Sequence, residues 1–233
     1  MVVTILGDLV AEEGARVPGP VLTKLTDPMG IKPEAMRVAI HRLRRDGWIS
    51  SERDGRTSLY GLTEHGRQLT RSVSDRVYGT SIKSPDRWRI LIAPNAETLQ
   101  GVDHFELIPI SPRVAVLPAE TVELPEALFA WDAIPGVVPD WVKAVLVPEE
   151  LDTAYALLAD ALALAAAFGT PQSPVDQAVL RLLALHQWRR LVLRHSTGVE
   201  AMMGSKWQGA LCRSVITDLL HRLKRPDLSN LAT

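Results

Sequence analysis

The chain has 233 residues, a hydrophobic fraction of 46% and a formal net charge of −1. This composition excludes a disordered chain, and the length allows two or three small domains, each with a buried core. The single cysteine, Cys212, excludes an intrachain disulfide and fits a reducing compartment. The longest apolar stretch, Leu157 to Phe168, is interrupted by Asp160 and is too short to span a bilayer. Because the N-terminus also lacks the basic segment of a signal peptide, we expect a cytoplasmic protein.

The charge is distributed unevenly along the chain. Residues 1–89 hold 15 lysines and arginines against 11 acidic residues, residues 90–160 hold 2 against 12, and residues 161–233 hold 9 against 4. Binding to a phosphate backbone needs only a local cationic surface, since screening limits useful interactions to about 8 Å at physiological salt. We therefore expect the acidic middle segment to face away from any duplex and to serve assembly.

Helical signals dominate the first 47 residues. Apolar periodicity predicts one helix at about Val2 to Glu13 and a second at Pro20 to Asp27. A third begins near Pro33, because proline suits the first helical position, where its missing N–H is not needed. Gly47 is expected to end this helix in the left-handed conformation.

This third helix has an apolar face and an opposite, cationic face. The apolar face carries Met36, Ile40 and Leu43 at positions i, i+4 and i+7. At about 100° per residue, the opposite face and its flanks carry Glu34, Arg37, Val38, His41, Arg42, Arg44 and Arg45.

A β-hairpin is predicted directly after this helix. Its strands are Trp48 to Arg53 and Thr57 to Leu62, which are rich in β-branched, aromatic and hydroxyl residues. Asp54-Gly55 is one of the strongest signals for a two-residue type I′ turn, since that turn needs positive φ at both positions. Arg53 and Arg56 flank the turn.

A further helix is expected after Thr63, which can cap it. Gly66 stands where a complete capping box would have Glu or Gln. The first region ends near Gly79, and the polar, non-periodic residues 80–85 end in proline and read as a linker.

This order of elements predicts a winged helix-turn-helix that binds DNA. Either the basic helix or the hairpin alone would be weak support, because charged helix faces are usually solvated and Asp-Gly hairpins occur in many folds.

The basic helix is expected to enter the major groove, with Arg37 contacting guanine, Val38 a thymine methyl and Glu34 a cytosine amine. His41, Arg42 and Arg45 are expected to meet phosphates, although Arg44 and Arg45 have the alternative role of complementing the helix C-terminus. The full predicted DNA-binding set is Lys32, Glu34, Arg37, Val38, His41, Arg42, Arg45, Arg53 and Arg56.

The middle region is predicted to be a small ferredoxin-like domain. Apolar, β-branched runs separated by Pro, Gly and Asp indicate short strands, with room for short helices between them. The expected order is strand Trp88 to Ala93, helix Pro94 to Asp103, strands Phe105 to Ile110 and Val114 to Leu117, helix Pro125 to Trp131, and strand Trp141 to Val147.

The last region reads as helical. One helix is expected from Pro148 to Phe168, before Gly169, because proline and Glu149-Glu150 suit a first turn. Others are expected from Ser173 to about His195 and from about Ser205 to Leu223. The predicted fold class is therefore a multidomain α+β protein with an all-α C-terminal domain.

Enzyme motifs are absent from the sequence. There is no G-x-S-x-G elbow, Walker A loop, G-x-G-x-x-G or H-E-x-x-H, so neither a cofactor nor a metal is expected. Asp86 and Asp103 lack the spacing that would require a nuclease site. The alternative from another class is an enzyme or nucleic-acid-processing protein that uses the winged helix only for protein interactions.

The chain resembles the PaaX-like transcriptional regulators, the phenylacetate-catabolism repressors. The residues that carry this resemblance are 37–43 (RVAIHRL), 46–49 (DGWI), 53–63 (RDGRTSLYGLT), 186–194 (HQWRRLVLR) and 207–213 (WQGALCR). The resemblance implies a winged helix in residues 1–80, a ferredoxin-like domain in 85–148 and a helical domain in 149–233. It also implies a homodimer that represses a phenylacetate-type pathway and is released from its operator by an aryl-CoA thioester.

Basic and aromatic residues near the C-terminus are candidates for effector binding. Arginines suit the phosphates of a CoA-like ligand, and indoles suit stacking on an aryl or adenine ring. The alternative is that the tryptophans are core residues and the arginines form a solvated face. The candidates are Trp188, Arg189, Arg190, Arg194, Trp207 and Arg213.

Overall fold

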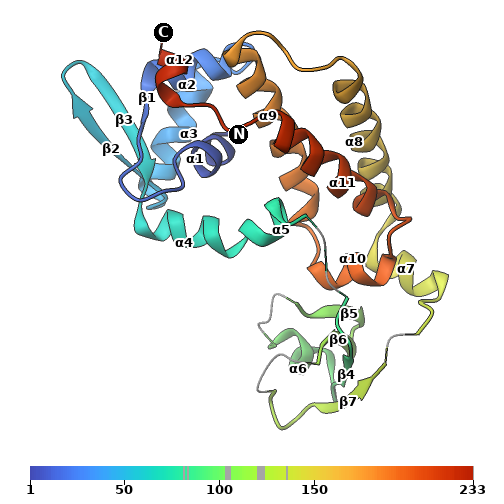
Figure 1. Ribbon diagram of the computed structural model, residues 1–233. Helices are drawn as coiled ribbons and strands as arrows, with labels where there is room; N and C mark the ends of the chain where they lie inside the picture. Colours follow the sequence, from blue (N-terminus) through green and yellow to red (C-terminus); the bar gives the residue numbers. More distant parts are fainter. Residues whose placement is uncertain (81, 83, 103–105, 120–123, 135, 233) are drawn as a thin grey trace. The chain divides into compact units, whose positions relative to one another are not determined.

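The computed structural model describes residues 1–80, 82, 84–102, 106–119, 124–134 and 136–232 (Figure 1). The chain forms two compact units. The first unit consists of residues 1–79, 161–190 and 215–233, and the second unit of residues 80–160 and 191–214. Among the described residues, no helix has the length and apolar character needed to cross a membrane.

The N-terminal part of the first unit alternates helices with a small antiparallel sheet. In chain order it contains α1 (Val2–Leu9), β1 (Val17–Pro18), α2 (Gly19–Thr26), α3 (Pro33–Arg45), β2 (Ile49–Asp54), β3 (Thr57–Leu62), α4 (Glu64–Ser72) and α5 (Ser74–Tyr78). The sheet order is β1-β3-β2, with both neighbouring pairs antiparallel. The predicted helices and hairpin are confirmed, except that α1 ends four residues earlier than expected.

The end of α3 follows the predicted chemistry. Gly47 has φ 72°, the left-handed conformation. The Gly47 N–H donates to the Arg44 carbonyl over 3.1 Å, and the Trp48 N–H donates to the Leu43 carbonyl over 2.9 Å. This pair of bonds is a Schellman motif, and it turns the chain sharply into β2.

The hairpin turn lies one residue later than predicted. The ladder pairs Asp54 with Thr57, so the two loop residues are Gly55 and Arg56, and the predicted Asp54-Gly55 turn is wrong. Gly55 has φ 57°, and a two-residue loop with glycine first is typical of a type II′ turn. As a result Arg56 lies at the tip itself, while Arg53 lies within β2.

Thr63 joins the base of the hairpin to two helices. Its hydroxyl oxygen accepts the Gly66 N–H at 3.0 Å, which is the predicted cap of α4, and the hydroxyl donates to the Gly47 carbonyl at 2.6 Å. A Cβ at position 66 would overlap the Trp48 carbonyl oxygen. Close packing therefore explains why glycine, and not Glu or Gln, stands three residues after the cap.

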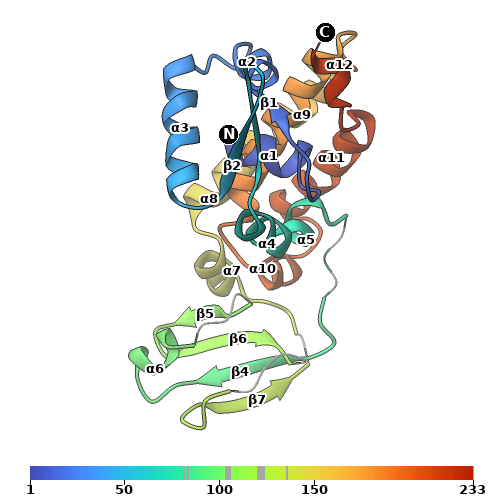
Figure 2. The same cartoon turned by 90° about the vertical axis from the view of Figure 1, so that its left-hand side faces the viewer.

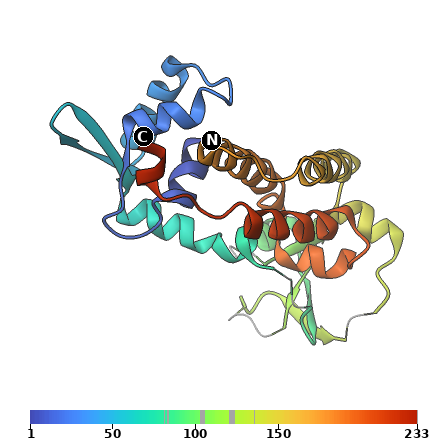
Figure 3. The same ribbon diagram turned by 45° about the horizontal axis from the view of Figure 1, so that its top comes forward.

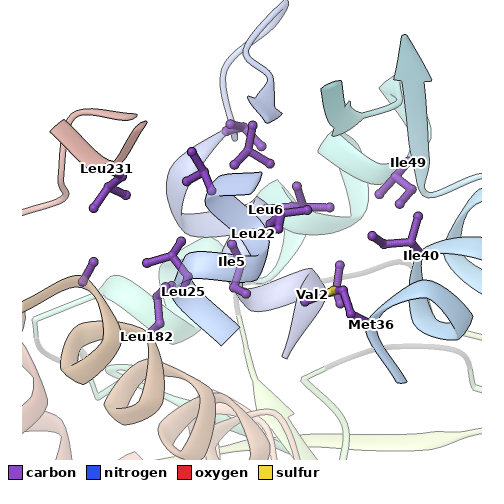
Figure 4. Close-up of a cluster of buried hydrophobic side chains, with 14 of the residues drawn as sticks. Val2, Ile5, Leu6, Leu22, Leu25, Met36, Ile40, Ile49, Leu182 and Leu231 are labelled. Carbon is purple, nitrogen blue, oxygen red and sulfur yellow. The ribbon is translucent and has the colours of Figure 1, made fainter. Parts of the chain in front are cut away.

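The core of the first unit combines both ends of the chain. Two helices from the C-terminal part, α9 (Pro174–Val192) and α12 (Leu228–Ala232), pack against the N-terminal helices; α12 lies against α2 (Figure 3). Figure 4 shows the shared apolar cluster, which includes Ile5, Leu6, Leu22, Leu25, Met36, Ile40, Ile49, Leu182 and Leu231. The predicted apolar face of α3 is confirmed, since Met36 and Ile40 are buried and Leu43 is partly buried.

A buried ion pair crosses this core. The Arg181 guanidinium of α9 donates to both carboxylate oxygens of Asp8 in α1, at 2.7 and 2.8 Å. Its remaining terminal nitrogen donates to the carbonyls of Leu220 and Leu223, at 3.0 and 2.7 Å. The Tyr78 hydroxyl also donates to Asp8, at 3.1 Å, and burial together with this carboxylate raises the pKa of Tyr78.

The second unit contains a four-stranded antiparallel sheet. The elements that lie wholly within this unit are β4 (Trp88–Ile92), α6 (Ala96–Gln100), β5 (Ile108–Ser111), β6 (Val114–Pro118), β7 (Phe129–Ala133), α7 (Asp140–Leu146) and α10 (Thr197–Met203). The strand order is β5-β6-β4-β7. Leu99 of α6 packs with Leu91, Ala115 and Leu117 from one face of this sheet.

Two predictions for this region are wrong. The expected strand Trp141 to Val147 is helix α7, in which Asp140 occupies the first turn and accepts a bond from Lys143 at 3.0 Å. The expected helix Pro125 to Trp131 is instead a turn followed by β7, which pairs with β4. The predicted helix from Pro94 is present as the shorter α6, capped by Asn95, while Asp103 and Phe105 lie outside the described residues.

The long C-terminal helices confirm the predictions. They are α8 (Glu149–Ala167), α9 and α11 (Gln208–Arg222). Gly169 follows α8 with φ 80°, and Pro174 opens α9. The short helices α10 and α12 were not predicted.

Replacing Arg181 tests whether the buried ion pair supports the first unit. We expect Arg181→Ala to lower the free energy of unfolding by about 3 kcal/mol, because the buried Asp8 charge then keeps only the Arg225 guanidinium, 3.8 Å away, and the Tyr78 hydroxyl. Tyr78→Phe removes only one hydrogen bond and should cost about 1 kcal/mol. Urea unfolding measures both values. Arg222→Ala, at an exposed position of α11, is the control and should stay within about 0.5 kcal/mol of the parent protein; an equally small effect of Arg181→Ala would contradict the proposed role.

Candidate nucleic-acid interface

Every predicted polar residue of α3 lies on its exposed side. Burial of Met36 and Ile40 fixes the rotation of the helix about its own axis, so residues half a turn away face solvent. Val38 is 69% exposed on this same side. The exposed predicted residues are Lys32, Glu34, Arg37, Val38, His41, Arg42 and Arg45.

The hairpin adds two more exposed cations. Its tip extends away from the helices of the first unit (Figures 1 and 3), and both Arg53 and Arg56 are exposed. Within the described part of the chain, no carboxylate lies within ion-pair distance of either guanidinium. Figure 2 shows α3 along one side of the first unit, with the hairpin beside it.

An ion pair that the sequence did not reveal holds the hairpin in place. Arg16, in the loop before β1, donates to Glu52 of β2 at 2.8 Å. The Arg16 side chain passes so close to Gly61 of β3 that a Cβ there would collide with it. A glycine inside a predicted strand is a general signal for such a close approach, but it does not identify the partner.

Some cations of α3 have acidic neighbours. Arg37 donates to Glu34 at 2.8 Å, with both side chains 73% exposed. Arg42 and Arg45 lie 3.6 and 3.2 Å from Asp46. Exposed pairs of this kind contribute little to stability, so their guanidinium groups remain available to a stronger anionic partner.

A hollow of about 300 Å³ lies where α2, α3 and the hairpin meet. Its lining includes the polar residues Thr23, Ser58, Arg37 and Arg56, together with the acidic residue Asp27 and several apolar residues. Hydroxyls and guanidiniums are the side chains that most often hold phosphate oxygens. The hollow therefore brings a residue of the basic helix and a residue of the hairpin tip to one surface.

The candidate effector residues divide between the two units. In the first unit, Trp188 is fully buried and its indole N–H donates to the Val77 carbonyl at 2.9 Å, while Arg189 is half-buried and Arg190 is exposed. In the second unit, Arg194 is exposed and Trp207 is buried, with its indole N–H donating to an Asp152 oxygen at 3.0 Å.

Arg213, the last of these candidates, belongs to a buried network of the second unit. It donates to both oxygens of Glu200, at 2.8 and 2.6 Å. Thr197, the first residue of α10, donates to Glu106 at 2.7 Å. These partners lie on different elements, and nothing in the local sequence predicted them. Among the described residues, Trp188, Trp207 and Arg213 are thus engaged in internal bonds.

Comparisons with known proteins match both ends of the chain. The family model "PaaX-like protein" matches residues 1–66, and the model "PaaX-like protein C-terminal domain" matches residues 148–231. The transcriptional repressor PaaX of Escherichia coli (strain K12) is 22% identical over 254 aligned residues, which cover 96% of this chain and 79% of that protein. A solved structure, protein Rv0674 from Mycobacterium tuberculosis, superposes with a TM-score of 0.59 at 18% identity and covers 95% of this chain and 93% of its own. That likeness concerns the fold alone.

Glu34→Gln tests whether the Glu34–Arg37 pair restrains the exposed face of α3. The change removes a negative charge and releases Arg37, so we expect random-sequence duplex DNA to bind roughly fivefold more tightly at low salt. Fluorescence anisotropy with a labelled duplex measures this. Asp218→Asn, an exposed position on α11 with the same change of charge, should leave the affinity unchanged. Equal gains in both variants would mean that only the net charge matters.

Proposed function

Because the chain belongs to the PaaX-like family of transcriptional regulators, we propose that it is a DNA-binding transcriptional repressor. The observation that carries this proposal is the combination of an exposed cationic face on α3 with an arginine at the tip of the adjacent hairpin. Clustered, exposed arginine and lysine side chains are the feature that binds a phosphate backbone, and the exposed acidic neighbours of Arg37, Arg42 and Arg45 hold them only weakly. The net charge of −1 is no obstacle, since the negative charge concentrates in residues 90–160.

In this proposal α2 and α3 form a helix-turn-helix and the β2–β3 hairpin forms the wing. The N-terminal half of α3 enters the major groove, where Glu34, Arg37 and Val38 meet base edges. His41, Arg42 and Arg45, further along the helix, meet phosphates, as does Lys32 before it. Arg53 and Arg56 of the wing reach the flanking backbone or minor groove. The hollow between α2, α3 and the hairpin supports this arrangement, since Arg37 and Arg56 both line it.

We further propose that the protein acts as a homodimer. A single winged-helix domain contacts few base pairs, so sequence-specific binding requires two copies on a two-fold symmetric site. The assignment keeps three functional segments: residues 1–80 for DNA binding, a ferredoxin-like segment 85–148 for assembly, and residues 149–233 for effector binding. The antiparallel sheet of the second unit, with its first strand between the third and fourth, supports the ferredoxin-like assignment.

The proposed signal is a small-molecule effector. By its family, the repressor would control an aromatic-compound pathway of the phenylacetate type and leave its operator when an aryl-CoA thioester binds. Among the effector candidates, Arg189, Arg190 and Arg194 keep guanidinium groups outside any described ion pair. They are therefore the residues on which the proposal mainly relies, while Trp188, Trp207 and Arg213 would take part only through their packing.

Two arginine variants separate base reading from backbone binding. Arg37→Ala should cost about 1–3 kcal/mol on the preferred sequence and relax the sequence preference. Arg56→Ala should weaken all sequences alike and reduce the slope of log affinity against log salt by about one unit. Mobility-shift titrations over a salt series measure both effects, on a duplex recovered from random DNA by repeated selection with this protein.

Arg222→Ala is the control: it removes one positive charge from α11 in the first unit, far in sequence from α3 and the hairpin. It should bind DNA as the parent protein does. If the parent protein showed no salt-dependent binding to any duplex, or if all three variants behaved alike, the proposed function would be wrong.

A further inference from the structure

One face of α9 carries three basic side chains that the DNA-binding proposal does not use. His186, Arg189 and Arg190 stand at positions i, i+3 and i+4, so they project from the same side of the helix. In the core of the first unit this side of α9 meets Thr4 of α1, which is only 2% exposed. His186 and Arg189 are half-buried and Arg190 is exposed.

A short chain of hydrogen bonds orders this basic cluster. The Arg189 guanidinium donates to the Thr4 hydroxyl oxygen at 3.0 Å. The same oxygen lies 3.1 Å from Nδ1 of His186. The Thr4 hydroxyl accepts from Arg189 and can donate its own proton to Nδ1, in the tautomer that carries the imidazole proton on Nε2. The cluster then offers hydrogen-bond donors and hardly any free acceptors.

No acid neutralises the cluster within the part of the chain that the structure describes. Neither Arg189 nor Arg190 lies within ion-pair distance of a described carboxylate, and Asp8, the acid of α1, is paired with Arg181 and Arg225 and accepts from Tyr78. Burial, followed by the positive charges of the Met1 amino group, Arg190 and Arg189, lowers the pKa of His186 to about 4.

Burying a guanidinium without an anionic partner is unfavourable. Burial accordingly lowers the pKa of Arg189 as well. In folded proteins, buried charges are almost always paired, so a half-buried arginine that no described carboxylate neutralises, beside a second arginine, is suited to binding an anion.

We propose that His186, Arg189 and Arg190, positioned by Thr4, form a binding site for the phosphate group of a small anionic ligand. Phosphate fits because planar guanidiniums bind two of its oxygens at once, and because the neutral imidazole supplies a donor without adding charge. A small ligand fits better than a duplex because part of the site is half-buried, whereas DNA-backbone contacts rely on exposed, flexible cations such as Arg53 and Arg56. A regulatory role for this site rests on the proposed function, in which Arg189 and Arg190 are effector candidates. Phosphate binding by the site does not depend on that function.

Titration of the full chain with inorganic pyrophosphate at pH 7.5 tests the site. Calorimetry should show saturable binding, and Arg190→Gln, an exposed position that should not disturb folding, should weaken it by about tenfold. Arg189→Gln should weaken it at least as much. Arg222→Gln, which removes the same charge from α11 in the same unit, should bind as the parent protein does.

Two results would overturn the proposal. One is absent pyrophosphate binding, or binding that is equal in Arg190→Gln, Arg189→Gln and Arg222→Gln. The other is an unchanged pyrophosphate affinity together with a loss of duplex affinity in Arg190→Gln, which would assign these cations to the DNA backbone. Because the calorimetric titration contains no DNA, a failure of the proposed repressor function would leave its result unaffected.

Discussion

The ion pair between Asp8 and Arg181 is the interaction on which the first unit depends. Its two residues are separated by 173 positions, and both are almost entirely buried. Removing two charges from water is costly, so such a pair is retained only where every donor and lone pair finds a partner. Here Arg181 makes four hydrogen bonds and Tyr78 adds a fifth to Asp8. The pair thereby fixes the helical C-terminal segments against α1, on which the apolar core with α2 and α3 is built.

That core determines what α3 presents to solvent. With Met36 and Ile40 buried, the helix has only one possible rotation, and its basic residues face outward beside the hairpin. The Schellman turn at Gly47 and the Thr63 hydroxyl then set where the hairpin leaves the helix. The proposed DNA-binding surface is thus the outer side of a core whose inner side includes residues from both ends of the chain.

The arginines fall into two groups according to whether a carboxylate meets them. Arg181 and Arg213 are buried and make bidentate contacts with Asp8 and Glu200, so they act in folding. Arg56 and Arg190 have no such partner among the described residues, and both remain accessible. Arginine is always charged at physiological pH, so an unpaired one on a well-packed surface is most useful where an anion binds. This contrast supports phosphate as the common chemistry of the hairpin tip and of the basic cluster on α9.

Local chemistry was sufficient to predict the elements that bear the proposed DNA-binding surface. Pro33, Gly47 and the Thr63 cap act within a few residues, so the sequence alone determined the limits of α3, the presence of the hairpin and the start of α4, and with them the exposed cationic residues, although the hairpin turn lies one residue later than predicted. Tertiary structure alone decided β7, whose pairing partner β4 lies about 40 positions earlier, and α7, where the valine-rich sequence predicts a strand. It also decided the Arg16–Glu52 contact, the entry of α9 and α12 into the first unit, and the basic cluster beside Thr4. The physical reason is that strand pairing, burial and charge neutralisation depend on partners far away in the chain, which no local pattern specifies.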